Sequence, residues 1–264
     1  MDRLEKALEK SRQQRASLGA QQSQPTPDQG VFAPLPQDAN AISAGSSLTQ
    51  SQEDLLERNR IVAHKPRCTE ADAYRLLRTQ VLQIMKSAGF KTLAITSPDY
   101  GDGKTTVAIN LALSISQDIK QTVLIADLDL RKPNLHQYLG IDTNTGLTDH
   151  ILKGIPLQDC IVKPGFDRIS VLPAGSVQEL SSELLGAPKM ISLAHELKTR
   201  YPDRFVIYDM PPVLAQDDSI AFLPHVDAVL VVVREGVTNA SRLRRCLQTL
   251  AGANVIGTVL NDCL

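Results

Sequence analysis

From Thr69 onward, short apolar runs alternate with longer segments in which apolar residues recur every three or four positions. The apolar runs predict strands at 91–96, 121–128, 168–172, 204–209, 228–233 and 255–260. The longer segments predict helices at 71–85, 104–119, 181–200 and 240–250. This alternation indicates an α/β fold with a mostly parallel, doubly wound sheet and helices on both faces. Ligands bind such sheets at the carboxyl ends of the strands.

The first 60 residues follow a different pattern, and we interpret them as an extension to a domain of residues 61–264. Leu4, Ala7 and Leu8 have helical spacing. That short helix either docks on a partner or frays, because so short a helix is unstable alone. Residues 21–52 are rich in Gln, Ser and Pro, which predicts a flexible, largely disordered linker. A second helix is expected to begin near Asp54.

Composition excludes several classes of function. The formal net charge is −1 over 264 residues, so no overall positive charge favours nucleic acid. No apolar run approaches the roughly 18 residues of a membrane helix, and the N-terminus lacks the apolar region of a signal peptide. We therefore expect a cytoplasmic protein with no direct membrane span. The four cysteines form no C-x-x-C pair and the five histidines are scattered, so we predict no zinc site.

The segment SPDYGDGKTT, residues 97–106, lies between a predicted strand and a predicted helix. It fits the phosphate-binding loop G-x-x-x-x-G-K-[ST], except that Pro98 replaces the first glycine. The glycines let backbone N–H groups turn inward and form an anion site with the helix N-terminus. Lys104 can reach the β- and γ-phosphates, and the Thr105 hydroxyl can bind magnesium. The predicted nucleotide-binding residues are Gly101, Asp102, Gly103, Lys104, Thr105 and Thr106.

Two further strands end in aspartate. Asp127 and Asp129 follow one strand at a spacing that places both carboxylates on one face. The run FVIYD ends in Asp209, which is the Walker B pattern. Carboxylates on one face repel each other unless a cation or proton relieves them, so these positions predict a magnesium site. The alternative is a solvated strand end.

The remaining chemistry of phosphoryl transfer is a group that orients or deprotonates the nucleophile. From the residues alone, either Asp127 or Asp129 could do this. The loop after Pro212 also carries Asp217 and Asp218, and we interpret both as solvated rather than as part of the site.

Together these motifs resemble the bacterial tyrosine kinases of capsule and exopolysaccharide systems, within the broad group of MinD/ParA-like P-loop NTPases. The resemblance covers roughly residues 69–261. Its most specific segment is DLDLRKPNLH, and it continues through LPAG, SELL, DMPPVLA and the terminal GTVLN.

The resemblance implies an ATP- and Mg²⁺-dependent protein tyrosine kinase in polysaccharide biosynthesis or export. It implies Lys104 and Asp127 as catalytic residues, with Asp127 the base that activates the acceptor hydroxyl. Thr105, Asp129 and Asp209 would hold magnesium, and Asn261 would contact the nucleotide base. The implied partner is the cytoplasmic segment of a membrane-embedded chain-length or export protein, which would recruit the chain to the inner face of the membrane.

The family also uses an E-x-x-R-x-x-R motif in ring assembly. In this chain the motif corresponds to Asp72, Arg75 and Arg78, with an aspartate in place of the glutamate. The arginines could pair with carboxylates of a neighbouring copy, so we expect a homo-oligomer. The alternative interpretation of these residues is a solvated basic face.

One departure leaves the phosphate acceptor open. Family kinases usually end in a tyrosine-rich tail, whereas the printed sequence ends NDCL and holds five tyrosines. Tyr100, Tyr138 or a partner's tyrosine would then be the acceptor. An ATPase switch without kinase activity is the alternative, although the lysine of the MinD/ParA K-G-G-x-G-K loop is replaced by Asp99. A nucleotide-bound assembly component with slow or no turnover is a third hypothesis, and the intact lysine and aspartates argue against it.

Overall fold

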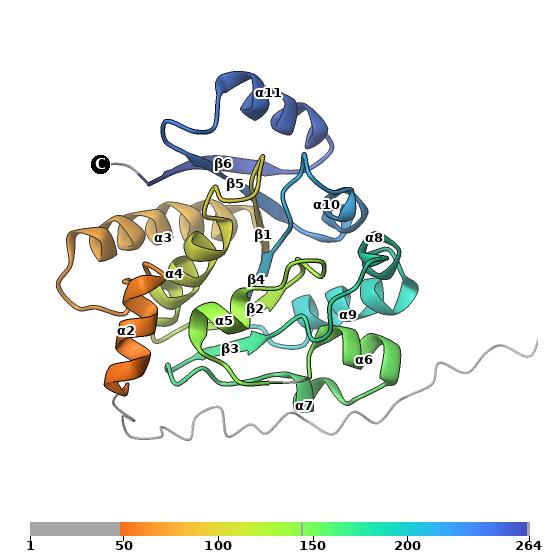
Figure 1. Ribbon diagram of the computed structural model, residues 1–264, viewed down its shortest axis with the longest axis horizontal. Helices are drawn as coiled ribbons and strands as arrows, with labels where there is room; N and C mark the ends of the chain where they lie inside the picture. Colours follow the sequence, from red (N-terminus) through yellow and green to blue (C-terminus); the bar gives the residue numbers. More distant parts are fainter. Residues whose placement is uncertain (1–47, 144, 263–264) are drawn as a thin grey trace, which may run out of the picture. The chain divides into compact units, whose positions relative to one another are not determined.

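The computed structural model describes residues 48–143 and 145–262. Six parallel strands form one sheet in the order β3-β2-β4-β1-β5-β6. The strands are β1 Thr92–Thr96, β2 Thr122–Asp127, β3 Ile169–Leu172, β4 Arg204–Asp209, β5 Ala228–Arg234 and β6 Val255–Asn261. The predicted parallel, doubly wound α/β sheet is confirmed (Figure 1).

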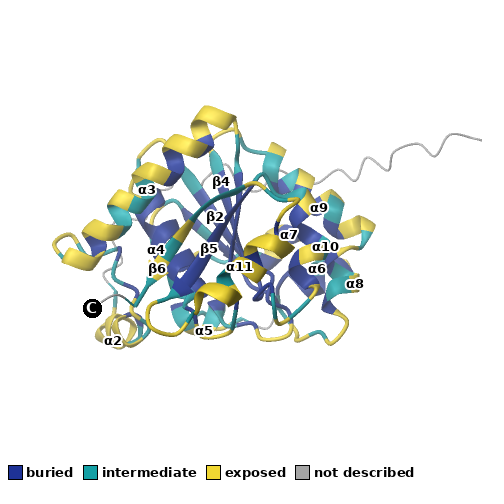
Figure 2. Cartoon of the chain, turned by 90° about the horizontal axis from the view of Figure 1, so that it is seen from above, coloured by how far each residue is buried: buried dark blue, intermediate teal, exposed yellow. Residues whose placement is uncertain are grey.

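Helices cover both faces of the sheet. The longer ones are α3 Thr69–Ala88, α4 Lys104–Ser116, α9 Pro188–Thr199 and α11 Ala240–Thr249. The shorter ones are α2 Gln50–Arg58, α5 Leu135–Leu139, α6 Leu147–Lys153, α7 Leu157–Cys160, α8 Ser181–Leu185, α10 Asp218–Phe222 and the 3₁₀ turn η2 Leu223–His225. Figure 2 shows buried strands beneath helices whose outer faces are exposed.

The core has two halves, one on each face of the sheet, because strand side chains alternate in direction. On β1, Leu93 and Ile95 pack with α3 and α4, whereas Ala94 packs on the opposite side with α9 and its neighbours. Both faces of the strand are buried, which explains why the inner strands read as apolar runs. No helix of the described residues is both long and apolar enough to cross a bilayer.

The helix predicted over 181–200 is wrong as a single element. The structure has two helices, α8 and α9, separated by Gly186 and Ala187. Ala187 has an extended backbone, as is usual before a proline, and Pro188 begins α9. The proline at this position therefore starts a new helix.

The second predicted helix begins earlier than expected, inside the segment interpreted as linker. Thr49 caps α2 through a reciprocal pair of hydrogen bonds with Gln52. Leu56 of α2 and the following Ile61 are buried in the core. Residues 50–61 therefore pack on the domain. The amphipathic helix predicted around Leu4 lies outside the described residues, and the boundary at residue 61 stays a prediction.

The sheet register brings the three sequence motifs together. Asp127 at the end of β2 pairs directly with Asp209 at the end of β4. Asp209 is also in register with Ile95 of β1, one residue before that strand ends and the glycine loop begins. All three motifs therefore meet at the carboxyl edge of the sheet, as predicted from the parallel topology.

Candidate active site

The loop after β1 takes a shape that requires glycine. Gly101 and Gly103 have φ angles of 85° and 92°, in the left-handed region that disfavours side chains. A Cβ on Gly103 would also lie 2.0 Å from Asn261 Nδ2, which donates a 3.0 Å hydrogen bond to the Asp102 carbonyl. The end of β6 is thus packed against the loop, and the contact of Asn261 with bound nucleotide stays a prediction.

The side chain of Asp102 braces the loop. It is buried, and its Oδ2 accepts a 2.9 Å hydrogen bond from the Asp99 backbone N–H. Its Oδ1 accepts a 2.9 Å hydrogen bond from the Thr238 hydroxyl. Only the backbone of Asp102 is therefore free to contribute to the anion site predicted for it.

Lys104 extends from the first turn of α4 into a group of buried aspartates. Its ammonium lies 2.9 Å from Asp129 Oδ2 and 3.7 Å from Asp209 Oδ1. Burial lowers the pKa of Lys104, but Asp209 and Asp129 outweigh that effect and hold it above its ordinary value. The lysine therefore stays charged. Thr105, the next residue, donates a 2.7 Å hydrogen bond from its hydroxyl to Asp209 Oδ2.

Asp127 is held differently from the other two aspartates. Its side chain has no exposed surface, and its oxygens accept hydrogen bonds from the backbone N–H groups of Asp129, Asn134 and Leu135, each 3.1 Å long. Burial and the neighbouring Asp209 raise the pKa of Asp127 to about 8. Asp127 therefore fixes the loop between β2 and α5, and its pKa lies close to neutral pH.

The donor set fits a magnesium ion held together with phosphates. Asp129 Oδ2 and Asp209 Oδ1 are buried and receive no well-aligned hydrogen bond in the described part of the chain, although the Lys104 ammonium is within ion-pair distance. Within that part, no three His, Cys, Asp or Glu side chains gather closely enough to ligate a metal by themselves. Mg²⁺ suits this arrangement, because it is commonly bound by one or two carboxylates plus substrate phosphates.

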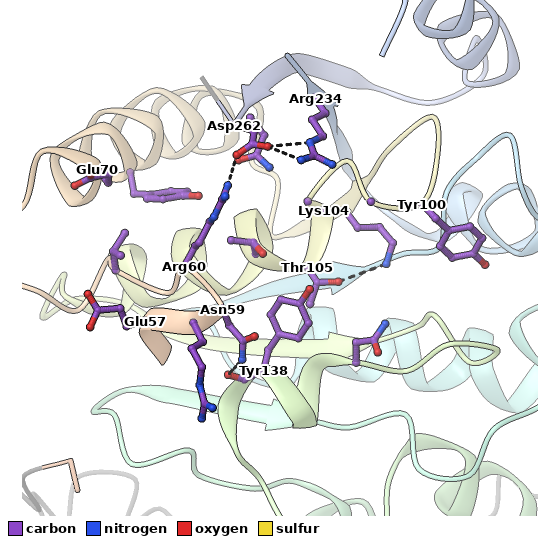
Figure 3. A pocket seen from close by; sticks show the side chains of 18 of the residues that line it. Glu57, Asn59, Arg60, Glu70, Tyr100, Lys104, Thr105, Tyr138, Arg234 and Asp262 are labelled. Carbon is purple, nitrogen blue, oxygen red and sulfur yellow. Dashed lines mark hydrogen bonds and ion pairs between the residues drawn. The ribbon is translucent and has the colours of Figure 1, made fainter. Parts of the chain in front are cut away.

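Lys104, Thr105 and Asp129 open onto a cavity of about 750 Å³ (Figure 3), whereas Asp127 and Asp209 lie behind its wall. Seven of the predicted site residues line it, namely Gly101, Gly103, Lys104, Thr105, Thr106, Asp129 and Asn261. Tyr100 and Tyr138, the two tyrosines predicted as acceptors, line it as well. The structure therefore brings together the phosphate loop, one acidic strand end and both candidate tyrosines around one space.

Sequence reasoning missed several charged residues that line the cavity, and among them Asp262 pairs with both Arg60 and Arg234. Arg234 and Asp262 stand at the carboxyl ends of β5 and β6, where the topology could have pointed to them. Arg60 follows α2 in the predicted extension, and no pattern in the sequence connects it with a strand end.

The interpretation of the loop after Pro212 is half right. The Asp217 side chain is 71% exposed, as expected, but that of Asp218 is fully buried and lies 3.5 Å from the Arg131 guanidinium. Arg131 also donates a 2.7 Å hydrogen bond to the Ser181 hydroxyl. Solvation of Asp218 is therefore contradicted, because this aspartate links the acidic segment after β2 to α8 and α10.

Asp72, Arg75 and Arg78 lie on α3 and not in the cavity. Arg75 pairs with Asp72 and donates 3.0 Å hydrogen bonds to the carbonyls of Lys65 and Pro66. Arg78 donates a 2.8 Å hydrogen bond to the Ser114 carbonyl on α4. Both arginines thus brace α3 within the chain, while the Asp72 side chain remains 70% exposed. Their role in an interface between copies stays a prediction.

From the buried aspartates we predict that the folded protein becomes less stable as the pH rises. Burial raises the pKa of Asp127 to about 8, so near neutral pH the folded protein holds more protons on this residue than the unfolded chain, and burial shifts the pKa of Asp209 in the same direction. The free energy of unfolding then decreases as pH rises toward about 8. We expect a lower melting temperature at pH 8 than at about pH 7, because this interval lies above the ordinary pKa of histidine and the opposite effect of His64, whose pKa burial lowers, is then small.

Added Mg²⁺ and ADP should flatten this pH dependence, because a bound cation stabilises the ionised carboxylates. A melting temperature of the ligand-free protein that stays level or rises over the same pH interval would contradict the raised pKa of the buried aspartates.

Comparison with known proteins supports the same fold and chemistry. The AAA domain family model matches residues 90–254. The chain is 30% identical over 217 residues to the tyrosine-protein kinase YwqD of Bacillus subtilis, covering 81% of this chain and 90% of that protein. It is also 30% identical over 208 residues to the succinoglycan biosynthesis transport protein ExoP of Rhizobium meliloti, covering 77% of this chain but only 26% of ExoP.

Solved structures give a consistent result. The kinase domain of the Escherichia coli tyrosine kinase ETK has a TM-score of 0.68 and 32% identity, covering 72% of this chain and 74% of that one. The septum site-determining protein MinD of Pyrococcus horikoshii, complexed with Mg-ADP, has a TM-score of 0.53 and 25% identity, covering 64% and 69% of the two chains. Similarity thus extends from tyrosine kinases to the wider group of P-loop ATPases.

Proposed function

Because the chain belongs to the family of bacterial tyrosine-protein kinases, we propose that it uses Mg²⁺ to transfer the γ-phosphate of ATP to a tyrosine hydroxyl. The observation that carries the proposal is the buried ammonium of Lys104 between Asp129 and Asp209, at the wall of a cavity large enough for a nucleotide. This arrangement matches the needs of phosphoryl transfer, in which neutralisation of charge and positioning supply most of the catalysis.

Each predicted residue has a proposed role in that reaction. The backbone N–H groups of the glycine loop and of Thr106 bind the phosphates, and Lys104 neutralises the charge that develops as the bond to ADP breaks. Thr105, Asp129 and Asp209 would hold Mg²⁺, which when bound supplies positive charge to the β- and γ-phosphates. Asn261 contacts the nucleotide next to the loop.

Two aspartates remain candidates for the base that accepts the tyrosine proton. Asp127 has a pKa close to neutral, which suits a general base, but it is fully buried behind the backbone of Asn134 and Leu135. An acceptor reaches it only if that loop moves. Asp129 already lines the cavity. We propose Asp127 as the base and Asp129 as the alternative.

We also propose the setting in which this kinase acts. The relative named for succinoglycan biosynthesis and transport supports a role in exopolysaccharide or capsule production. The partner would be the cytoplasmic segment of a membrane-embedded chain-length or export protein, which recruits the chain to the inner face of the membrane. Assembly into a homo-oligomer would use the face of α3 that carries Asp72, whose carboxylate is exposed.

Incubation with γ-labelled ATP and Mg²⁺, followed by mapping of the label, tests the proposal. We expect phosphotyrosine on Tyr100, Tyr138 or an added partner segment. Tyr208 is fully buried in β4 and serves as an internal control that should stay unlabelled. Release of free phosphate with no phosphotyrosine, alone and with the partner segment, would favour the ATPase switch instead.

A further inference from the structure

Three charged residues form a cluster at the end of the cavity away from Tyr100, and we call Arg60, Arg234 and Asp262 the distal cluster (Figure 3). Arg234 at the end of β5 donates from Nε to Asp262 Oδ2 at 2.9 Å, and its Nη2 lies 2.8 Å from the same oxygen. Arg60 pairs with the other carboxylate oxygen, Oδ1. One carboxylate thus orients two guanidinium groups, and the cluster has a net positive charge.

The segment that carries Arg60 is fixed to the helix of the phosphate loop. Asn110, buried on α4, accepts hydrogen bonds of 2.8 and 2.9 Å from the backbone of Val62 and Ala63. Its Nδ2 donates a 2.9 Å hydrogen bond to the Arg60 carbonyl. Arg60 itself has a φ of 56°, an unfavourable left-handed conformation that these contacts hold in place. The backbone position from which Arg60 projects is therefore fixed by buried contacts.

The Arg60 guanidinium is itself accessible. Its side chain is 71% exposed, compared with 22% for Asp262. An exposed ion pair contributes little to stability, so the pairing of Arg60 with Asp262 does not prevent a ligand from entering the cavity. The guanidinium plane can stay paired at its edge while its face remains open to a flat ligand.

The position of the phosphates determines which part of a nucleotide reaches this cluster. The triphosphate is bound at Lys104 and the glycine loop, and Asn261 lies directly against Gly103. Asp262 is the residue after Asn261, so the distal cluster begins immediately beyond the predicted contact with the base. A nucleotide held by its phosphates and contacted at its base by Asn261 would therefore extend its ring into the part of the cavity that Arg60 lines.

We propose that the Arg60 guanidinium stacks on the purine ring of the bound nucleotide, with Asp262 and Arg234 holding it in position. This inference rests on the proposed ATP site and adds a binding residue from outside the sequence motifs. A planar, delocalised guanidinium suits stacking on an aromatic ring, whereas a lysine ammonium supplies charge without a matching plane. The segment between α2 and α3 thereby becomes part of the nucleotide site.

Calorimetric titration of the full chain with ADP and with inorganic tripolyphosphate, both with Mg²⁺, tests this inference. Arg60→Ala should weaken ADP binding by about tenfold, since stacking on a partly desolvated cation is worth that much. Arg60→Lys should lose most of the same affinity. Both variants should bind tripolyphosphate like the wild type, because the phosphates do not touch Arg60.

The matched control is Arg67→Ala, which removes the same charge from an exposed position outside the cavity and should leave both affinities unchanged. Full ADP affinity in Arg60→Ala or in Arg60→Lys would overturn the stacking assignment. An equal loss of ADP and tripolyphosphate binding would overturn it too, by showing a phosphate contact. Wild-type protein that binds neither ligand would instead contradict the proposed function.

Discussion

Replacing Lys104 with methionine is expected to reduce the rate of phosphate transfer by about 10²–10³-fold, the usual effect of removing one charge-stabilising group from a transition state. The methionine keeps much of the side-chain volume but removes the ammonium that lies 2.9 Å from Asp129. The developing charge on the transferred phosphate then meets buried carboxylates with no fixed cation between. The rate is measured by single-turnover transfer of labelled phosphate.

The same substitution should change stability in the absence of ligand. Removing one partner of a buried ion pair commonly costs about 3–5 kcal/mol, because a charge is left unpaired. Protonation of Asp129 or Asp209 would relieve part of this cost, so the loss should be smaller at low pH. Lys120→Met, at an exposed position, is the matched control and should behave like the wild type. A Lys104→Met protein with unchanged rate and stability would remove the basis of the site assignment.

Asparagine substitutions at the two aspartates after β2 should separate their roles. In Asp129→Asn we expect the Mg²⁺ concentration for half-maximal activity to rise at least about tenfold, because the cation loses a charged ligand. The loss of stability should be smaller than in Lys104→Met, since the Lys104 ammonium keeps Asp209 as a partner at 3.7 Å and one like charge is removed from the group. The measurements are activity against Mg²⁺ and a thermal melt.

Asp127→Asn should act on stability through a different cause, which is the loop between β2 and α5. Its carboxylate accepts three backbone N–H groups, and an amide would offer one oxygen while its NH₂ faced a donor. Leaving a buried donor unsatisfied costs about 1–3 kcal/mol, so the melting temperature should fall. If both variants melted alike and both kept the Mg²⁺ dependence of the wild type, the division of labour between the two aspartates would be wrong.

The sheet and the motifs were predictable because they depend on local pattern. Buried parallel strands read as apolar runs, and their carboxyl ends lie at one edge of the sheet, so the sequence alone could place Asp127 and Asp209 at the same edge. That β2 and β4 are neighbours and bring the two carboxylates side by side is seen only in the structure. The split between α8 and α9 could also have been read from Pro188, since the residue before a proline avoids the helical region.

The remaining features depend on contacts between distant parts of the chain. Arg60 and Asp262 are separated by 202 positions, and no periodicity in either segment indicates their pairing. In the sequence, Asp218 looks like a solvated loop carboxylate. In the structure it is buried 3.5 Å from the guanidinium of Arg131, a residue 87 positions earlier in the chain. Asn110 is a polar residue within an apolar helix, and only the fold shows that it anchors the segment at residues 60–63.

The most direct test of the central claim is a crystal structure of the chain with ADP and Mn²⁺ in place of Mg²⁺, in which anomalous scattering locates the metal. We predict one anomalous peak beside the Thr105 hydroxyl and the carboxylates of Asp129 and Asp209, with the phosphates of ADP on the glycine loop. A nucleotide bound elsewhere, or a metal away from these three side chains, would contradict the account.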